Sequence, residues 1–273
     1  MQKTLRKITA KETLEITEQG FYINTKQQKV DISILQQNAI DGTKFYSSKE
    51  LDLVSKKTVI NNQYTTSFEV LEETSINSIQ RLISLGFSNP MCLNFASAKN
   101  PGGGFFNGAQ AQEESIARSS GLYPCQLSAI EFYETHRKMK SCIYTDGMIY
   151  SPKVPIIRKD SGELLDTAIE CSIITAATVN TGVVKRFESH KVDTIKNIMK
   201  KRIDKLLMLS ASNDHKTLIL GAWGCGVFQN DPNMIAGLFS ELLKEKYKGV
   251  FQKVVFAIYA KNKKFIEAFK NEF

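Results

Sequence analysis

The key segment of the sequence is residues 94–120, which read NFASAKNPGGGFFNGAQAQEESIARSS. The short apolar run before it, MCLNF at 91–95, is typical of a buried strand. Asn100 and Pro101 predict a turn, and three glycines at 102–104 then offer backbone without Cβ atoms. Helix-forming residues follow as far as Ser120, from a start between 109 and 112. This order predicts a strand, a glycine loop and a helix whose free N–H groups face an anion.

The triplet Gln112, Glu113 and Glu114 falls in the first turn of this predicted helix. Neighbouring residues on a helix point about 100° apart, so we expect only one carboxylate to reach the glycine loop. Two acidic groups beside an anion site repel its ligand, so they would be a poor choice for anion binding alone. Their presence therefore favours an acid–base or sugar-binding role for one of them. The plain alternative is structural, because Glu complements the dipole of a first turn and a triple glycine can be a flexible loop.

A second glycine loop, GAWGCGVFQND, occupies residues 221–231. It follows the apolar run TLIL at 217–220 and precedes a predicted helix over 231–247, with Asp231 as N-cap and Pro232 at the first helical position. Its glycines suit close backbone contact with a phosphate, although it is neither a P-loop nor a dinucleotide-binding fingerprint. The alternative is a tight turn packed over Trp223.

Short β-branched runs alternate with amphipathic segments along the rest of the chain. We expect helices over residues 4–19, 75–85, 190–210 and 263–271, and strands over residues 21–32, 169–178 and 254–259. No repeat or linker interrupts this pattern, which predicts one α/β domain with a largely parallel or mixed sheet covered on both faces.

The charge balance favours an anionic partner. Lys and Arg number 36 against 28 Asp and Glu, a formal net charge of +8. The basic segment 185–205 is a candidate for attracting a polyanion, or is simply a solvated helix face. No helix-turn-helix, zinc finger or RNP motif is present, so we expect no sequence-specific nucleic acid as partner. The apolar runs fall short of the ~20 residues of a membrane span, and the N-terminus lacks the apolar core of a secretory signal, so we expect no membrane association.

Five cysteines and three histidines show no metal-binding or disulfide pattern. The cysteine number is odd, and no CxxC pair occurs, so we expect no bound metal and reduced thiols in a cytoplasmic protein. Cys125 and Cys225 lie near the glycine motifs. Neither has a histidine next to it in the sequence that could activate its thiol, so we do not expect a catalytic cysteine.

Taken together, the two loops resemble those of the microbial-type poly(ADP-ribose) glycohydrolases. GGG, seven residues and QEE fit the family signature, and GCGVF at 224–228 is similar to its diphosphate loop. The resemblance implies a macrodomain-like three-layer α/β/α sandwich with a mixed sheet, plus an N-terminal helical extension. It implies a single domain over residues 1–273, with about 1–88 as an accessory N-terminal part and about 89–273 as the ADP-ribose-binding core.

The function that this resemblance implies is hydrolysis of the ribose–ribose O-glycosidic bonds of poly(ADP-ribose). ADP-ribose would be released, mainly from the free end, without a cofactor. Glu114 would be the general acid and Glu113 would hold ribose hydroxyls. The implied substrate-binding residues are Asn100, Gly102, Gly103, Gly104, Gln112, Gly224, Cys225, Gly226, Val227 and Phe228, of which Asn100 and Phe228 would hold the terminal ribose. The partners would be poly(ADP-ribose) or ADP-ribosylated protein as substrate, and ADP-ribose as product.

Two other functions use the same pocket. One is hydrolysis of mono-ADP-ribose from a protein or nucleic acid. The other is a reader module that binds ADP-ribose without cleaving it. The intact QEE triplet argues against a reader, because a binding module has no use for the second anion.

Overall fold

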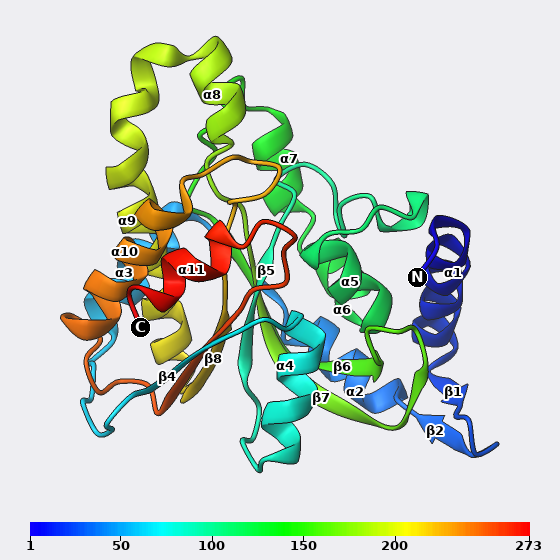
Figure 1. Cartoon of the computed structure of the whole chain (residues 1–273). Coiled ribbons are helices and arrows are strands. Elements are labelled where there is room, and N and C mark those ends of the chain that lie inside the picture. Colours follow the sequence, from blue (N-terminus) through cyan, green and yellow to red (C-terminus); the bar gives the residue numbers. More distant parts are fainter.

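A twisted seven-stranded sheet runs through the middle of the protein in the computed structural model, which describes residues 1–273 (Figure 1). The strands are β1 (Phe21–Ile23), β2 (Lys29–Asp31), β3 (Lys44–Tyr46), β4 (Ser67–Leu71), β5 (Met91–Phe95), β6 (Met148–Arg158), β7 (Leu164–Ala176), β8 (Thr217–Leu220) and β9 (Lys253–Ala257). The sheet has the order β3-β6-β7-β5-β8-β9-β4, while β1 and β2 form a separate hairpin. Strands β7, β5, β8, β9 and β4 are parallel, whereas β6 and β3 are antiparallel to their neighbours. The carboxyl ends of five strands therefore meet at one edge.

Helices cover both faces of this sheet. They are α1 (Lys3–Gln19), α2 (Ser33–Asp41), α3 (Ser48–Lys57), α4 (Ser75–Ser84), α5 (Gln112–Ser119), α6 (Leu122–Ser128), α7 (Glu131–Arg137), α8 (Thr181–Phe187), α9 (Ile195–Ser212), α10 (Pro232–Lys244) and α11 (Lys264–Lys270), with 3-10 turns η1 (Phe105–Asn107) and η2 (Ser189–Thr194). None of these helices is both long and apolar enough to cross a bilayer.

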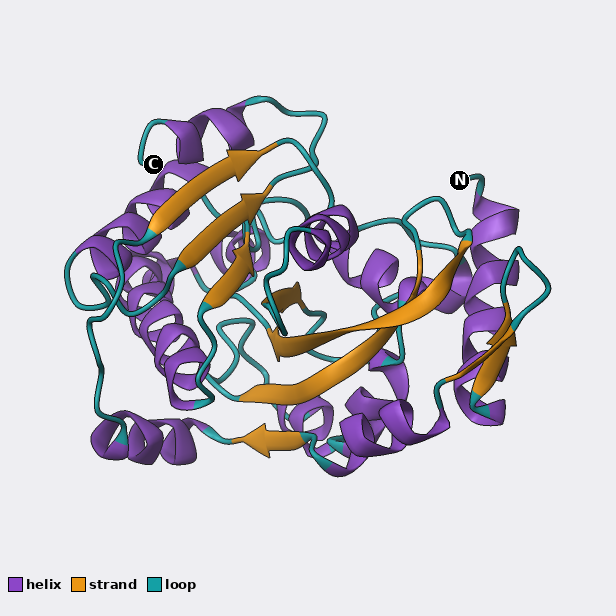
Figure 2. Cartoon of the chain, turned by 90° about the horizontal axis from the view of Figure 1, so that it is seen from below, coloured by secondary structure: helices purple, strands orange, loops and turns teal.

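Successive residues of the central strands face opposite layers. Leu93 packs toward α9 and α10, whereas Cys92 packs toward α4 and α5 on the other side. Helices α3, α9, α10 and α11 contribute to the first layer, and α2, α4, α5 and α6 to the second. Figure 2 shows helices on both sides of the strands, so the expected three-layer α/β/α sandwich with a mixed sheet is confirmed.

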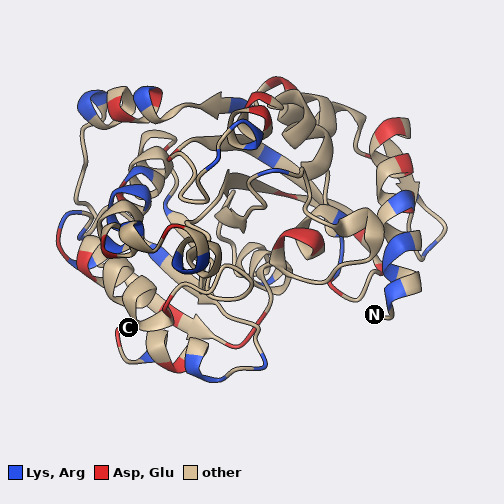
Figure 3. Cartoon of the chain, turned by 90° about the horizontal axis from the view of Figure 1, so that it is seen from above, with Lys and Arg blue, Asp and Glu red and all other residues tan.

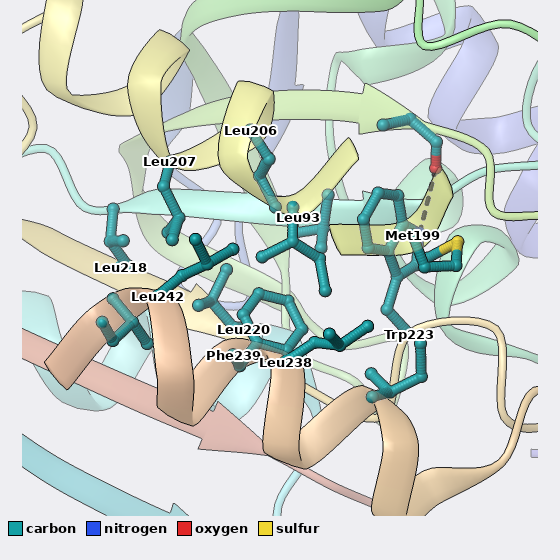
Figure 4. Close-up of a cluster of buried hydrophobic side chains, with 14 of the residues drawn as sticks. Leu93, Met199, Leu206, Leu207, Leu218, Leu220, Trp223, Leu238, Phe239 and Leu242 are labelled. Carbon is teal, nitrogen blue, oxygen red and sulfur yellow. Dashed lines mark hydrogen bonds between the residues drawn. The ribbon is translucent and has the colours of Figure 1, made fainter. Parts of the chain in front are cut away.

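The larger core lies between the sheet and helices α9 and α10 (Figure 4). Met199 and Leu206 of α9 and Phe239 of α10 are fully buried there. Trp223 is also fully buried, and its indole N–H donates to the carbonyl of Ala176, the dashed line in Figure 4. This bond ties the second glycine loop to the end of β7.

Residues 1–88 contribute directly to the sheet. They supply both of its edge strands, β3 and β4, as well as α4 of the second layer. Helix α1 and the β1–β2 hairpin lie outside the sheet, and α1 runs beside α5 (Figure 1). The buried Thr13 hydroxyl donates to the carbonyl of Arg118 at 2.6 Å, which fixes α1 to the end of α5. The N-terminal helical extension is thus docked on the core.

Several elements differ from the sequence-based expectation, and the edge strands β3 and β4 are among those that were not expected. Residues 21–32 form a hairpin instead of one strand, because Gln27 adopts a left-handed conformation (φ 60°) and the Asn24 side chain caps the turn. The helix expected from residue 190 begins at Ile195, after the 3-10 turn η2. The long strand β6 was not expected, because its Pro152 and Pro155 are unusual inside a strand.

Candidate active site

The first glycine loop begins at the end of β5, at the edge where the parallel strands terminate. The carbonyl of Asn100 accepts the N–H of Gly103 at 3.0 Å, which closes the expected turn. Gly102 and Gly103 have φ values of 64° and 58°, a left-handed conformation that glycine adopts without strain. After the 3-10 turn η1, α5 starts at Gln112, the last residue of the expected range.

Both carboxylates of the glutamate pair reach this loop. A Cβ placed on Gly103 would lie 2.5 Å from Glu114 Oε1 and 3.0 Å from Glu113 Oε2. The expectation that only one of them reaches the loop is therefore wrong. Both carboxylates reach the loop because the glutamate side chain is long, so two neighbouring residues at the start of a helix can direct their carboxyl groups toward one point. Only glycine fits at position 103 between them.

Glu113 is the more enclosed of the two and is only 4% exposed. Its Oε2 accepts the N–H of Ser97 at 2.6 Å, and its Oε1 accepts the side-chain amides of Asn94 and Gln126, each at 3.3 Å. Burial raises the pKa of Glu113 to about 8, and the nearby charge of Glu114 adds to this, although the hydrogen bond from Ser97 acts in the opposite direction.

Glu114 has a different environment. Its Oε1 accepts the N–H of Gly104 at 3.0 Å, so the glycine loop itself holds the carboxylate in place. Its Oε2 is buried and has no hydrogen-bond partner in the protein. A buried carboxylate oxygen without a partner is costly, and a ligand that completes its hydrogen bonding is one explanation for it.

Gln112 braces the loop against the sheet. Its side-chain oxygen accepts the N–H of Phe95 at 2.8 Å, and its amide donates to the carbonyl of Leu93 at 2.7 Å and to the Ser75 hydroxyl at 3.0 Å. All three bonds fix the start of α5 to β5 and α4. The side chain of Gln112 thus positions its two glutamate neighbours.

The second glycine loop leaves the end of β8, which is paired with β5. Three successive backbone N–H groups, those of Gly226, Val227 and Phe228, donate no hydrogen bond within the protein. Consecutive free N–H groups form a concave anion-binding surface. Gly226 has nothing within 4 Å of where a Cβ would stand, and Val227 is 83% exposed, so this part of the loop is open to a ligand.

Other residues of this loop have structural roles. Gly224 has φ 74°, and a Cβ there would lie 2.3 Å from the Thr178 hydroxyl. Asn230 is buried and donates to the carbonyls of Val179 and Gly224, at 2.9 and 3.2 Å. Cys225 is a buried thiol, and burial raises its pKa to about 12, which suits packing and not nucleophilic attack.

Phe228 and Asn100 lie on the outer parts of the two loops. The Phe228 ring is half-buried against Tyr144, with ring centroids 6.3 Å apart, and its carbonyl accepts the N–H of Gly182 at 3.1 Å. Asn100 is exposed at the start of its turn, and its own N–H donates to the Ser97 hydroxyl at 3.2 Å. The Asn100 side chain has no hydrogen-bond partner in the protein.

A cavity of about 550 Å³ lies between the second loop and the start of α5, and neither Glu113, Glu114 nor the glycines 102–104 line it. Gly226 lines it from the second loop, and Gln110, Ala111 and Gln112 line it from the start of α5. Phe95 and Tyr259 supply aromatic surface, and the acidic residues Glu72, Glu73 and Asp160 and the basic residues Lys261 and Lys263 stand around it. The structure therefore brings together the two motifs that the sequence places more than a hundred residues apart.

Sequence reasoning missed the residues that support the site. Asn94 and Gln126 hold Glu113, and Thr178 and Asn230 hold the second loop. A weak signal was available for two of them, because Asn94 interrupts an otherwise apolar buried strand and Gln126 an apolar helix. A buried amide in such a position needs a polar partner.

Comparison with known families and structures decides the assignment. Residues 10–159 match the catalytic domain of microbial-type PARG, the poly(ADP-ribose) glycohydrolase. The poly(ADP-ribose) glycohydrolase of Thermomonospora curvata is 36% identical and superposes with a TM-score of 0.94, over 99% of this chain and 100% of that one. The chain belongs to the microbial-type PARG family.

Other PARG structures agree with this assignment. The Thermomonospora curvata enzyme bound to the inhibitor ADP-HPD is also 36% identical, with a TM-score of 0.92 over 99% of this chain and 100% of that one. The Deinococcus radiodurans enzyme in complex with ADP-ribose is 37% identical, with a TM-score of 0.82 over 87% of this chain and 96% of that one. No curated protein sequence gave a significant match.

Proposed function

We propose that this PARG-family protein hydrolyses the ribose–ribose O-glycosidic bonds of poly(ADP-ribose), from the free end, with Glu114 as general acid. The observation that carries the proposal is the unpartnered, buried Oε2 of Glu114, whose other oxygen is held by the Gly104 N–H. Glycoside hydrolysis needs a positioned carboxylic acid to protonate the leaving oxygen as an oxocarbenium-like state develops. A substrate oxygen would supply the partner that this carboxyl oxygen lacks.

The raised pKa of Glu113 fits this proposal, because a protonated Glu113 repels a bound diphosphate less than a carboxylate does. We propose that its Oε2, which faces Gly103, also holds ribose hydroxyls of the adjoining unit. The free amides of Gly226, Val227 and Phe228 would bind the diphosphate, and the cavity beside Gly226 would take the adenosine end. Asn100 and Phe228 would contact the terminal ribose.

The decisive experiment compares Glu114→Gln with the wild type. The glutamine oxygen can still accept the Gly104 N–H, but the side chain cannot donate an acid proton. Polymer cleavage should fall by ~10²-fold or more, the usual worth of a general acid, while ADP-ribose affinity stays similar or rises. Cleavage at the wild-type rate would show that Glu114 is not the acid.

Substrate class and direction are tested with the wild-type protein. It should release free ADP-ribose from poly(ADP-ribose) much faster than from a mono-ADP-ribosylated protein. Single ADP-ribose units should precede any short oligomers when the polymer length is followed over time. Preferred release from the mono-ADP-ribosylated protein would instead assign the hydrolase to that substrate, and no release from either would assign a reader.

We also propose a cytoplasmic location. All five cysteines are free thiols, and four of them are buried, as expected for a protein that folds in a reducing compartment. Localisation of a tagged full-length chain by cell fractionation tests this.

A further inference from the structure

The charges on α1 run opposite to the usual order. Its basic residues lie in the N-terminal half and its acidic residues in the C-terminal half, as the blue and red segments of this helix in Figure 3 show. The helix dipole favours the reverse arrangement. No acidic residue stands in the first turn, and the N-cap Gln2 makes no side-chain capping bond. A local rule that is broken without local compensation is a common mark of a functional surface.

Three of these basic residues, Lys3, Lys7 and Lys11, form one ridge, which we call the α1 lysine ridge. They are four positions apart and so lie on one side of the helix, over a length of about 12 Å. All three are exposed.

The α1 lysine ridge borders the catalytic loop. A Cβ placed on Gly108 would lie 3.1 Å from the Cγ atoms of both Lys3 and Lys7, and 2.6 Å from the carbonyl oxygen of Lys3. The Arg6 guanidinium donates to the Gly108 carbonyl at 2.7 Å and holds the helix there. Gly108 ends the 3-10 turn that begins directly after Gly104, the residue that binds Glu114.

The ridge is also free of acidic partners. None of its three lysines forms an ion pair within the protein. The basic segment 185–205 is partly neutralised, because four of its eight Lys and Arg residues contact Glu or Asp side chains. The α1 lysine ridge differs from that segment because it lies against the glycine loop that holds Glu114.

We infer that the α1 lysine ridge binds the diphosphate of the poly(ADP-ribose) unit on the leaving-group side of the scissile bond. This inference rests on the proposed function. The leaving chain starts at the oxygen that Glu114 protonates, and Glu114 is fixed to the glycine loop against which α1 packs. Each polymer unit carries a diphosphate, whose negative charges complement a row of lysines without partners.

The test is the triple variant Lys3→Gln, Lys7→Gln and Lys11→Gln, assayed on long poly(ADP-ribose) at several salt concentrations. Loss of the contacts to the two phosphates of one diphosphate should reduce the slope of log kcat/KM against log salt by about 1.4, taking the factor for single strands. Between 50 and 200 mM salt, wild-type kcat/KM should thus fall by roughly 7-fold more than that of the variant.

Two controls separate this effect from others. The first is a variant with the same change in charge, Lys56→Gln, Lys57→Gln and Lys248→Gln, whose lysines are exposed, make no ion pair and lie outside the site. It should keep the wild-type salt slope. The second is an aryl glycoside of ADP-ribose, whose leaving group carries no phosphate. The ridge variant should hydrolyse this substrate, and bind ADP-ribose, as the wild type does.

The melting temperature gives an independent readout. Replacing lysines at the positive end of a helix removes an unfavourable charge, so the ridge variant should melt at the wild-type temperature or slightly above. An unchanged salt slope on polymer, or an equal loss on polymer and on the aryl glycoside, would overturn the inference. A wild type that cleaves neither substrate would instead overturn the proposed function.

Discussion

Glu113 and Glu114 are adjacent in sequence, yet their surroundings divide their roles. Glu113 is enclosed by three donors from β5, its following loop and α6, and burial raises its pKa to about 8. Glu114 has one donor, a glycine amide, and an unpartnered oxygen. Environments that separate two carboxyl groups in this way commonly assign one to chemistry and the other to binding or support.

The raised pKa of Glu113 predicts how stability depends on pH. The pKa is 4.5 in the unfolded chain and about 8 in the folded one, so the folded protein binds the extra proton between these values. Glu113 thus contributes stability that is complete below pH 4.5 and is lost as the pH rises through 8. Glu113→Gln should remove up to about 1.4 kcal/mol per pH unit from the slope of unfolding free energy over this range.

Denaturant unfolding of both proteins from pH 5 to 8 measures this slope. Glutamine is a fair substitute, because its amide can donate to Asn94 Oδ1 or Gln126 Oε1, both of which have no partner when Glu113 is present. Parallel stability profiles for wild type and variant would mean that Glu113 is charged in the folded protein.

At this scale, the sequence singled out the two glutamates but not the residues that hold them. Glu113 and Glu114 stand out because a signature contains them. The signature does not contain the three residues that hold Glu113, which are Asn94, Ser97 and Gln126. Their contacts with Glu113 form only after β5, α5 and α6 have packed together. Such contacts depend on tertiary structure and leave little local pattern.

At the scale of elements, the two glycine loops use their glycines for different purposes. Gly224 needs a left-handed conformation and has no room for a side chain, whereas Gly226 has no positive φ and faces open space beside the cavity. A sequence cannot separate these cases, because both residues appear simply as glycine in GCG.

This difference predicts opposite outcomes for two variants. Gly226→Val should leave the melting temperature close to that of the wild type but abolish ADP-ribose binding, because its branched side chain occupies the space in front of the free amides. Gly224→Ala should instead destabilise the fold, because its Cβ would meet the Thr178 hydroxyl in a strained conformation. Calorimetric titration with ADP-ribose and thermal melts measure both. Normal ADP-ribose affinity in Gly226→Val would show that this loop is only a turn.

The elements themselves were predicted best where one local signal was strong. Strands β5 and β8 have the expected bounds, and Asp231 caps α10 as expected, accepting the N–H of Asn233 at 2.9 Å. The strands β3, β4 and β6 were missed, since two are short edge strands and the third contains two prolines and a bulge. Whether these segments form strands depends more on the strands they pair with than on their own residues.

At the scale of the whole molecule, the site depends on two distant parts of the chain. Neighbouring strands β5 and β8 bring residues 96–114 beside residues 221–231, and the N-terminal helix packs against the first of these loops. Neither loop holds a ligand site alone, because the carboxylates belong to one and the open backbone amides to the other. A ligand that spans both should therefore stabilise the entire fold.

ADP-ribose should raise the melting temperature more than AMP at equal concentration. A ligand that binds only the folded state contributes about 2.7 kcal/mol at a hundred times its dissociation constant. For a chain of this size that corresponds to roughly 5–10 °C. AMP has one phosphate and no second ribose, so it cannot engage the free amides of Gly226, Val227 and Phe228 and the Glu113–Glu114 loop together. Differential scanning fluorimetry of the wild type with each ligand, and of Gly226→Val as a control that should lose the ADP-ribose shift, measures the difference. Equal shifts with AMP and ADP-ribose would mean that only one of the two loops contacts the ligand.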